Sequence, residues 1–227
     1  MRTVGLLGGM SAESTTYYYQ AMNRLVRERL GGLHSMQLLM WSVDFAPIAK
    51  MQADGDWAGA GAVLARAAAR LEGAGAEAIM IGANTMHIVA DQVQAAISVP
   101  LIHIADATAD AVKARGGSRP LLLATRFTME KAFYRDRLAA QGVEAQVPDQ
   151  ADRDRLHAII YDELCQGVVS PASKAEVLAM IARAGDADSV IFGCTEVGLL
   201  LSPLDVAAPV IDTALVHAEA GVRFALS

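Results

Sequence analysis

Residues 79–87, IMIGANTMH, and residues 190–198, VIFGCTEVG, have the same layout. Each is a short apolar run that ends in a glycine and is followed by a polar turn, from which a helix is expected to start. A short apolar run bounded by turn residues is typical of a strand buried in a parallel sheet. The two stretches therefore predict two similar strand–turn–helix units in one chain.

The flanking segments extend this similarity into an internal repeat. VGLLGGMS (4–11) corresponds to LLLATRFT (121–128), and PLIHIAD (100–106) corresponds to PVIDT (209–213). The steps from Ala83 to Cys194 and from Pro100 to Pro209 are nearly equal in length, so the order and the spacing of the segments are both repeated. Such self-similarity indicates a duplicated architecture.

Strand and helix patterns alternate along the whole chain, which predicts an α/β protein. We expect two pseudo-symmetric, Rossmann-like domains with mainly parallel sheets: residues 1–99 plus 208–227, and residues 100–207. Ligands bind beyond the carboxyl ends of such strands, so we expect the active site in the cleft between the domains. Further expectations are strands over 35–45 and 143–149 and single helices over 85–95 and 151–167.

The composition excludes several classes of protein. Of the 227 residues, 53% are hydrophobic and 19% are charged, which favours a compact globular fold over disorder. The net charge of −6, without a basic block, argues against nucleic acid or a membrane surface as a partner. No stretch resembles a membrane span or a signal peptide, so we expect a cytoplasmic protein.

The chain has two cysteines, too few for a disulfide framework, and no Cys/His spacing typical of zinc. Cys194 follows a buried-strand pattern where a helix is expected to begin. A helix start lowers the pKa of a thiol, so Cys194 is a candidate base or nucleophile, the alternative being a small buried hydrophobe. Cys165 lies on the apolar side of the expected helix 151–167, and we interpret it as ordinary packing.

Hydroxyl and amide side chains occupy the turns that follow the strands. At a helix start, such groups and the unpaired backbone N–H groups bind a carboxylate or phosphate, whereas the simpler interpretation is helix capping. Four turns of this kind suggest an anionic ligand, and the absence of a G-x-G-x-x-G or P-loop pattern disfavours nucleotides. These candidates are Ser11, Asn84, Thr85, Thr125, Thr128 and Thr195. His87 and His217 are interpreted as structural.

The chain resembles the aspartate/glutamate racemase family, in particular its aspartate racemase branch, over nearly its whole length. The resemblance is carried by motifs in the family's order: GLLGGMSAEST, SVDF, NTMHIVAD, HIADAT, TRFTMEKAFYRDRL, IFGCTE and DTALVHAEA. It implies two α/β domains with the active site between them, no pyridoxal phosphate, no metal and a homodimer. It also implies a small-molecule amino-acid substrate, with aspartate or glutamate favoured.

Catalysis in this family uses two opposed acid/base residues, usually cysteines, which exchange the α-proton on opposite faces of the substrate. The resemblance places the second of them at Cys194 and the first at Ala83, which has no exchangeable proton. It further implies that the substrate is held by Met10, Gln52, Asn84, Thr85, Thr125, Thr128 and Thr195. Arg155 is the one candidate for binding a side-chain carboxylate.

Alanine at position 83 leaves three interpretations open. The protein racemises amino acids with Asn84, Thr85 or a water acting on that face. Alternatively, it carries out proton transfer on one face only, as the related arylmalonate decarboxylases do. In the third interpretation it is a catalytically weak binding protein, natural or made by replacing a cysteine with alanine. A small-molecule sensor without enzymatic activity is a fourth alternative, of a different class.

Overall fold

The computed structural model describes all 227 residues and divides into two compact units. The first contains Met1–Ile104 and His217–Ser227, and the second contains Ala105–Val216. The predicted boundaries, 99/100 and 207/208, both lie before those of the two units, and the second differs more than the first. The last helix, α11 (Thr213–Leu226), starts in the second unit and contributes most of its length to the first.

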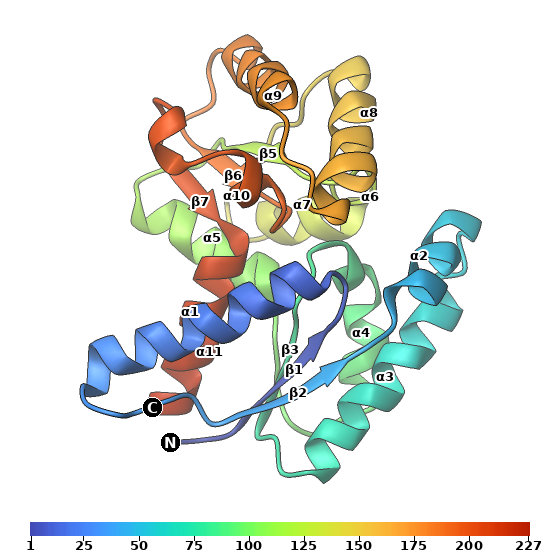
Figure 1. Cartoon of the computed structure of the whole chain (residues 1–227), viewed down its shortest axis with the longest axis vertical. Helices are drawn as coiled ribbons and strands as arrows, with labels where there is room; N and C mark the ends of the chain where they lie inside the picture. Colours follow the sequence, from blue (N-terminus) through green and yellow to red (C-terminus); the bar gives the residue numbers. More distant parts are fainter. The chain divides into compact units, whose positions relative to one another are not determined.

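The first unit is built on a four-stranded parallel sheet of order β2-β1-β3-β4. Helices α1 (Ala12–Leu30) and α11 lie on one side of this sheet, whereas α3 (Trp57–Gly73) and α4 (Ala90–Gln94) lie on the other (Figure 1). The strands are β1 (Val4–Gly8), β2 (Leu38–Ser42), β3 (Ala78–Ile81) and β4 (Leu101–Ile102). The expected strand over 35–45 is shorter than predicted, since Asp44 caps a further helix, α2 (Phe45–Asp54).

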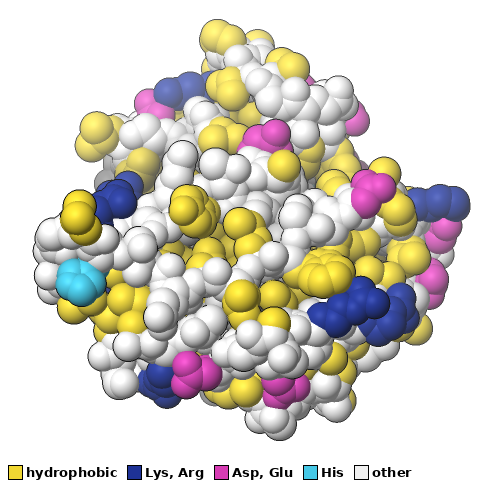
Figure 2. All heavy atoms as spheres, turned by 60° about the horizontal axis from the view of Figure 1, so that its bottom comes forward, with side chains coloured by type: hydrophobic (Ala, Val, Ile, Leu, Met, Phe, Trp, Pro, Cys, Tyr) yellow, Lys and Arg dark blue, Asp and Glu magenta, His cyan; other side chains and the backbone are white.

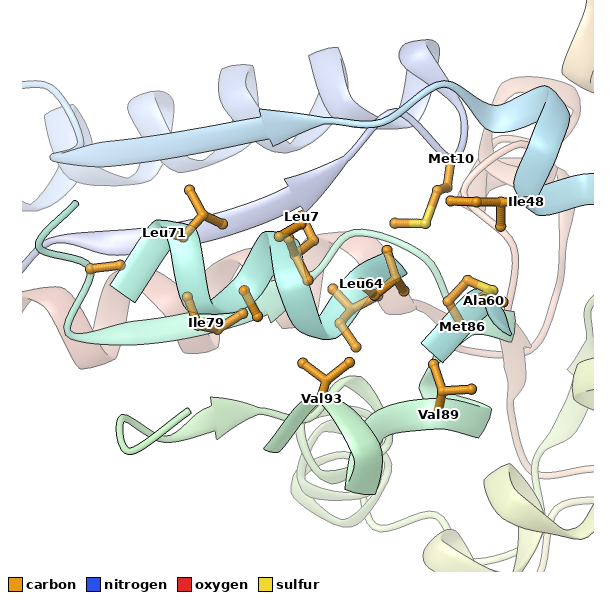
Figure 3. Packing of buried hydrophobic residues seen from close by; sticks show 14 residues of the cluster. Leu7, Met10, Ile48, Ala60, Leu64, Leu71, Ile79, Met86, Val89 and Val93 are labelled. Carbon is orange, nitrogen blue, oxygen red and sulfur yellow. The ribbon is translucent and has the colours of Figure 1, made fainter. Parts of the chain in front are cut away.

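The core of the first unit lies between α3 and the sheet. Leu64 and Leu71 of α3 pack with Leu7 and Ile79 of the sheet, and all four side chains are buried. Each is worth roughly 1.5–3 kcal/mol of burial. Met10, Ile48 and Met86 lie at one end of this cluster, away from Leu71 and Ile79 (Figure 3). That end carries the turns that follow β1 and β3.

The second unit contains a three-stranded parallel sheet of order β5-β6-β7. The expected strand over 143–149 is reduced to one parallel bridge between Gln146 and Leu121. The strands are β5 (Leu121–Leu123), β6 (Val190–Phe192) and β7 (Val210–Asp212). The helices are α5 (Ile104–Ala114), α6 (Arg126–Glu130), α7 (Ala132–Ala139), α8 (Gln150–Ala158), α9 (Pro171–Arg183) and α10 (Val197–Leu200).

The internal repeat is confirmed by the order of the strands. β1-β3-β4 in the first sheet corresponds to β5-β6-β7 in the second, and all pairings are parallel. Even single hydrogen bonds recur: the Gly82 N–H donates to the Leu7 carbonyl at 2.8 Å, and the Gly193 N–H donates to the Leu123 carbonyl at 2.7 Å. Ala83 and Cys194 each follow the glycine of this pair, so they occupy equivalent positions in the two units.

Two segments predicted as single helices change their hydrogen bonding along their length. The segment 85–95 starts as a 3₁₀-helix, η1 (Thr85–Val89), before α4. The segment 151–167 is α8, then a π-helix, η2 (Ile159–Glu163), and a 3₁₀ turn, η3 (Leu164–Gln166). Apolar spacing cannot separate these helix types, because their residues per turn differ too little over five positions. Both irregular segments adjoin the candidate site residues.

No helix is long and apolar enough to cross a membrane. On the face shown in Figure 2, most charged side chains are scattered among uncharged and apolar ones, and one group of basic side chains lies together at the right.

Candidate active site

The first unit gathers one group of candidate residues at the carboxyl end of its sheet. Since β1 pairs in parallel with β3, the turn containing Met10 lies beside the turn that starts at Ala83. Gln52 of α2 is buried and donates from Nε2 to the Met86 sulfur at 3.1 Å, which brings α2 against the same turn. The structure therefore brings together Met10, Gln52, Ala83, Asn84 and Thr85.

The turn after β1 depends on Gly9. This residue has φ +88°, and a side-chain carbon there would lie 2.2 Å from the Val43 carbonyl oxygen. Its N–H donates to the Thr15 hydroxyl at 2.7 Å, and that hydroxyl donates to the Ser11 carbonyl. Ser11 accepts from the Ser14 N–H as the N-cap of α1, so its structural interpretation is supported.

His87 fixes the backbone of the turn that contains Ala83. Its Nδ1 lies 2.8 Å from the Ala83 carbonyl oxygen, and its Nε2 accepts from the Ile104 N–H at 3.2 Å. A carbonyl only accepts, so Nδ1 carries the proton and the ring is neutral. His87 therefore positions the turn, as the structural interpretation predicts, and its ring nitrogens are both engaged.

His217 belongs to the same buried group. Its Nε2 donates to the Ile102 carbonyl at 2.7 Å, and its Nδ1 therefore accepts from the Tyr18 hydroxyl at 2.8 Å. The His87 ring packs edge-on against the rings of His103 and His217. Burial without a neighbouring carboxylate lowers the pKa of His217 to about 4, so it is neutral at physiological pH.

Buried neutral His217 makes the protein sensitive to acid. Its pKa in the folded chain is about 4, below its ordinary value of 6.5, so the unfolded chain binds the proton more tightly. We expect stability to be complete above about pH 6.5 and to fall by roughly 3 kcal/mol as the pH drops towards 4. Urea unfolding between these pH values measures the slope. His217→Gln is expected to flatten it and the exposed His34→Gln to leave it unchanged; an equally steep slope in His217→Gln contradicts the assignment.

In the second unit Cys194 follows β6, and its thiol is paired with a carboxylate. Cys194 Sγ donates to Glu196 Oε2 at 2.8 Å, and the Thr195 hydroxyl donates to the same oxygen at 2.6 Å. Glu196 is almost completely buried, with 4% of its surface exposed. Thr195 therefore binds this carboxylate and does not cap a helix, which corrects the simpler interpretation of its hydroxyl.

The expectation that a helix start lowers the pKa of Cys194 is wrong. α10 begins only at Val197 and has four residues, so no long helix directs its dipole at the thiol. Burial raises the pKa of Cys194 well above its ordinary value, and the charge of Glu196 and its hydrogen bond raise it further. In the resting protein Cys194 is a protonated thiol beside a carboxylate.

Removing the charge of Glu196 is expected to make the thiol more acidic. In Glu196→Gln the repulsion between thiolate and carboxylate disappears, so the pKa of Cys194 should fall. The rate of alkylation by iodoacetamide as a function of pH reports the thiolate fraction. Its midpoint should move to lower pH in Glu196→Gln and stay in place in Glu163→Gln, a carboxylate bonded to Ser173 instead. An unchanged midpoint in Glu196→Gln would refute the coupling.

The Thr125 turn lies beside the Cys194 turn, because Leu123 pairs with Phe192. Thr125 is the N-cap of α6 and accepts from the Thr128 N–H at 3.4 Å, and the two hydroxyls lie 3.3 Å apart. The cap is Thr125, whereas Thr128, fully buried, is not a cap. The second unit thus brings together Thr125, Thr128, Cys194 and Thr195.

Sequence patterns miss three neighbours of this group. His157 Nδ1 accepts from the Arg126 N–H at 3.4 Å, which ties α8 to the Thr125 turn, and its ring packs on Tyr161 of the π-helix. The pKa of Tyr161 is raised by burial and by Cys194 and Cys165. Cys165 is also among the lesser causes of the raised pKa of Cys194, so it lies near that thiol. A π-helix at a functional site is a recurrent feature, but only the structure reveals it.

No group of three or more His, Cys, Asp or Glu side chains is arranged to hold a metal ion. The polar side chains at both strand-end turns are instead hydroxyls, amides, one thiol and one carboxylate. Such groups bind and transfer protons, and they hold small polar ligands.

These features define a class: a duplicated α/β protein with parallel sheets, whose repeated strand-end turns carry a thiol in one unit. Comparison with known proteins places the chain within that class. Residues 7–221 match the Asp/Glu/hydantoin racemase family, and the chain belongs to this family.

Two solved structures and one curated protein illustrate the relationship. A candidate Asp/Glu racemase from Yersinia pestis is 46% identical, with a TM-score of 0.93, and an aspartate racemase homologue from Pyrococcus horikoshii is 34% identical, with a TM-score of 0.87. Each alignment covers 100% of both chains. A broad-specificity amino-acid racemase from Bacillus subtilis is 22% identical, with 96% of each chain covered. Family membership supports a racemase-type function.

Proposed function

We propose that this protein is a cofactor-independent racemase-type enzyme that transfers the α-proton of an amino acid through Cys194. The observation that carries the proposal is the hydrogen bond between the partly buried Cys194 thiol and the buried Glu196 carboxylate, beside the Thr125 turn. A thiol in this environment is a proton carrier of the kind that α-proton chemistry requires. Family membership and the equivalence of the Ala83 and Cys194 turns support the same proposal.

The pair explains how a thiol of raised pKa could act as a base. Cys194 already donates its proton towards Glu196 Oε2, so moving that proton to the carboxylate creates a thiolate without changing the net charge of the pair. Burial penalises this transfer less than loss of the proton to solvent. The thiolate then removes the α-proton, and the hydroxyl and amide groups of the strand-end turns hold the substrate α-carboxylate.

The opposite face of the substrate is assigned to the turn that contains Ala83, from the family resemblance and the internal repeat. Ala83 is partly buried and packs against the apolar cluster of the first unit, so its own side chain offers no proton. Inversion would then depend on Asn84, Thr85 or a water, and one-face exchange would be faster than inversion. Proton transfer on one face with decarboxylation is the alternative activity that Ala83 favours.

Deuterium incorporation at Cα tests the proposal. The protein is incubated with single enantiomers in D₂O, and label and chirality are measured separately. A racemase labels and inverts the substrate, whereas a one-face enzyme labels it without inversion. Absence of label in every amino acid offered would refute the proposed function and favour a binding protein.

The resemblance favours aspartate or glutamate as the substrate, whereas the relative from Bacillus subtilis is described as having broad specificity. A homodimer is proposed from the resemblance, and the cytoplasmic location expected from the sequence remains a proposal. Sedimentation equilibrium over a range of concentrations tests the dimer.

A further inference from the structure

We infer that the site accepts amino acids with uncharged, apolar side chains in preference to aspartate and glutamate. The inference rests on the proposed function and specifies its substrate class. Two observations support it. The basic side chains near the Thr125 and Cys194 turns are paired with protein carboxylates, and uncharged aromatic side chains lie beside the Thr125 turn.

Arg155, the residue expected to bind a side-chain carboxylate, is already bound to protein carboxylates. Its Nε lies 2.6 Å from Glu176 Oε2 and its Nη2 lies 2.9 Å from Glu176 Oε1. Glu163 lies 3.5 Å from the same guanidinium. Two fork-like hydrogen bonds to one carboxylate use the geometry with which arginine would bind a substrate carboxylate.

Arg155 is also directed away from the candidate site. His157, two residues further along α8, contacts the backbone of the Thr125 turn. Two residues on a helix are separated by roughly 200° around its axis, so Arg155 lies on the opposite side of α8, facing α9. This geometry argues against Arg155 as a ligand of the substrate.

The other cations near the strand ends have partners as well. Arg126 adjoins Thr125, and its Nη1 lies 3.6 Å from Asp154 Oδ1. In the first unit, Lys50 on α2 binds Asp54 at 2.6 Å. Arg126 is the basic side chain closest in sequence to the candidate residues, so its role in binding a substrate carboxylate is tested directly below.

An uncharged aromatic column, formed by Phe127, His157 and Tyr161, lies beside the Thr125 turn. The rings of Phe127 and His157 are 5.6 Å apart and edge-on, and the rings of His157 and Tyr161 are 4.6 Å apart. Burial and Arg126 lower the pKa of His157, while burial and Cys194 raise the pKa of Tyr161. Both are therefore neutral at physiological pH. An apolar side chain can pack on such rings.

The charge already present at the site disfavours a second substrate carboxylate. The Cys194–Glu196 pair carries one negative charge, on Glu196 at rest and on the thiolate once the proton has moved, and Glu196 is buried. A substrate side-chain carboxylate would add a second negative charge, and Arg126 and Arg155, the basic side chains nearest to these turns in sequence, already lie beside protein carboxylates. An apolar side chain adds none.

The test measures kcat/KM for Cα deuterium exchange with L-methionine, L-phenylalanine, L-aspartate and L-glutamate. We expect each apolar substrate to exceed each acidic one by about tenfold or more. Equal or faster exchange with aspartate or glutamate overturns the inference and leaves the proposed function intact. No exchange with any of the four overturns both.

Variants of Tyr161, Arg155 and Arg126 test which side chains determine the preference for apolar substrates. Tyr161→Lys places a cation in the aromatic column and should shift the ratio of methionine to aspartate exchange towards aspartate by at least about tenfold. Tyr161→Phe should keep the ratio of the parent protein. Arg155→Gln should also keep it, since Arg155 faces α9. A selective loss of aspartate exchange in Arg155→Gln, or in Arg126→Gln, overturns the inference even if Tyr161→Lys fails to fold.

Discussion

Cys194→Ala is expected to lower the rate of Cα deuterium exchange by at least about 10³-fold, because the variant has no group to accept the α-proton at that position. Cys194→Ser should be almost as inactive. A serine hydroxyl is a far weaker acid than a thiol, so the proton transfer to Glu196 that creates the base becomes much less favourable. The measurement is label incorporation per active protein, with folding checked by circular dichroism.

Cys165→Ala is the matched control for this experiment. Cys165 is the other cysteine of the chain, half-buried in η3, and it influences Cys194 only as an electrostatic neighbour. We expect its loss to change exchange by less than about threefold, in line with a modest effect on the pKa of Cys194. Exchange that survives in Cys194→Ala, or that is lost equally in both variants, rules out the proposed role of Cys194.

Much of the fold could be predicted from local patterns in the sequence. The apolar runs at 79–82 and 190–193 identify buried parallel strands, and the repeat around them predicts the matching strand orders of the two sheets. α2 could not be predicted, because residues 45–54 directly follow an apolar strand and Asp44 is the only residue that indicates the start of a helix. The strand over 143–149 shrank to a single bridge, since pairing depends on neighbours that periodicity does not describe.

The positions of the turns that carry the candidate residues could be predicted from the sequence, whereas the pKa of the Cys194 thiol could not. Glycine, thiol and hydroxyl residues after apolar runs located the turns that contain Ala83, Thr125 and Cys194. Whether a thiol is acidic depends on its burial and on which carboxylate reaches it, and sequence spacing shows neither. For Cys194, burial reverses the expected direction of the pKa shift, and Glu196, two residues further along, adds to it.

The side-chain directions around α8 illustrate a second limit. Arg155 and His157 both lie on α8, so regular helical spacing already places them on opposite sides of the helix. Which side packs on the Thr125 turn is decided by tertiary contacts, in particular that of His157 with the Arg126 N–H. Assigning a substrate contact to Arg155 from sequence therefore required geometry that only the folded chain supplies.

Ala83→Cys is expected to increase inversion far more than exchange. If position 83 serves the second face of the substrate, a thiol there supplies the missing acid, and racemisation should rise by about 10²- to 10³-fold. Exchange on the Cys194 face should change little, because that half of the reaction already has its base. The ratio of inversion to label incorporation, measured by chiral chromatography and mass spectrometry on one sample, isolates this effect.

The structure shows why this substitution is compatible with the fold. Ala83 is only partly buried, and its backbone is held by the His87 hydrogen bond to its carbonyl, which a change of side chain leaves in place. Ala83→Ser is the matched control, since it has similar size but a weakly acidic hydroxyl, and it should gain much less. An Ala83→Cys protein that exchanges normally but inverts no faster would show that position 83 does not face the substrate. Its alanine would then be a packing residue of the first unit, and inversion would have to depend on another group.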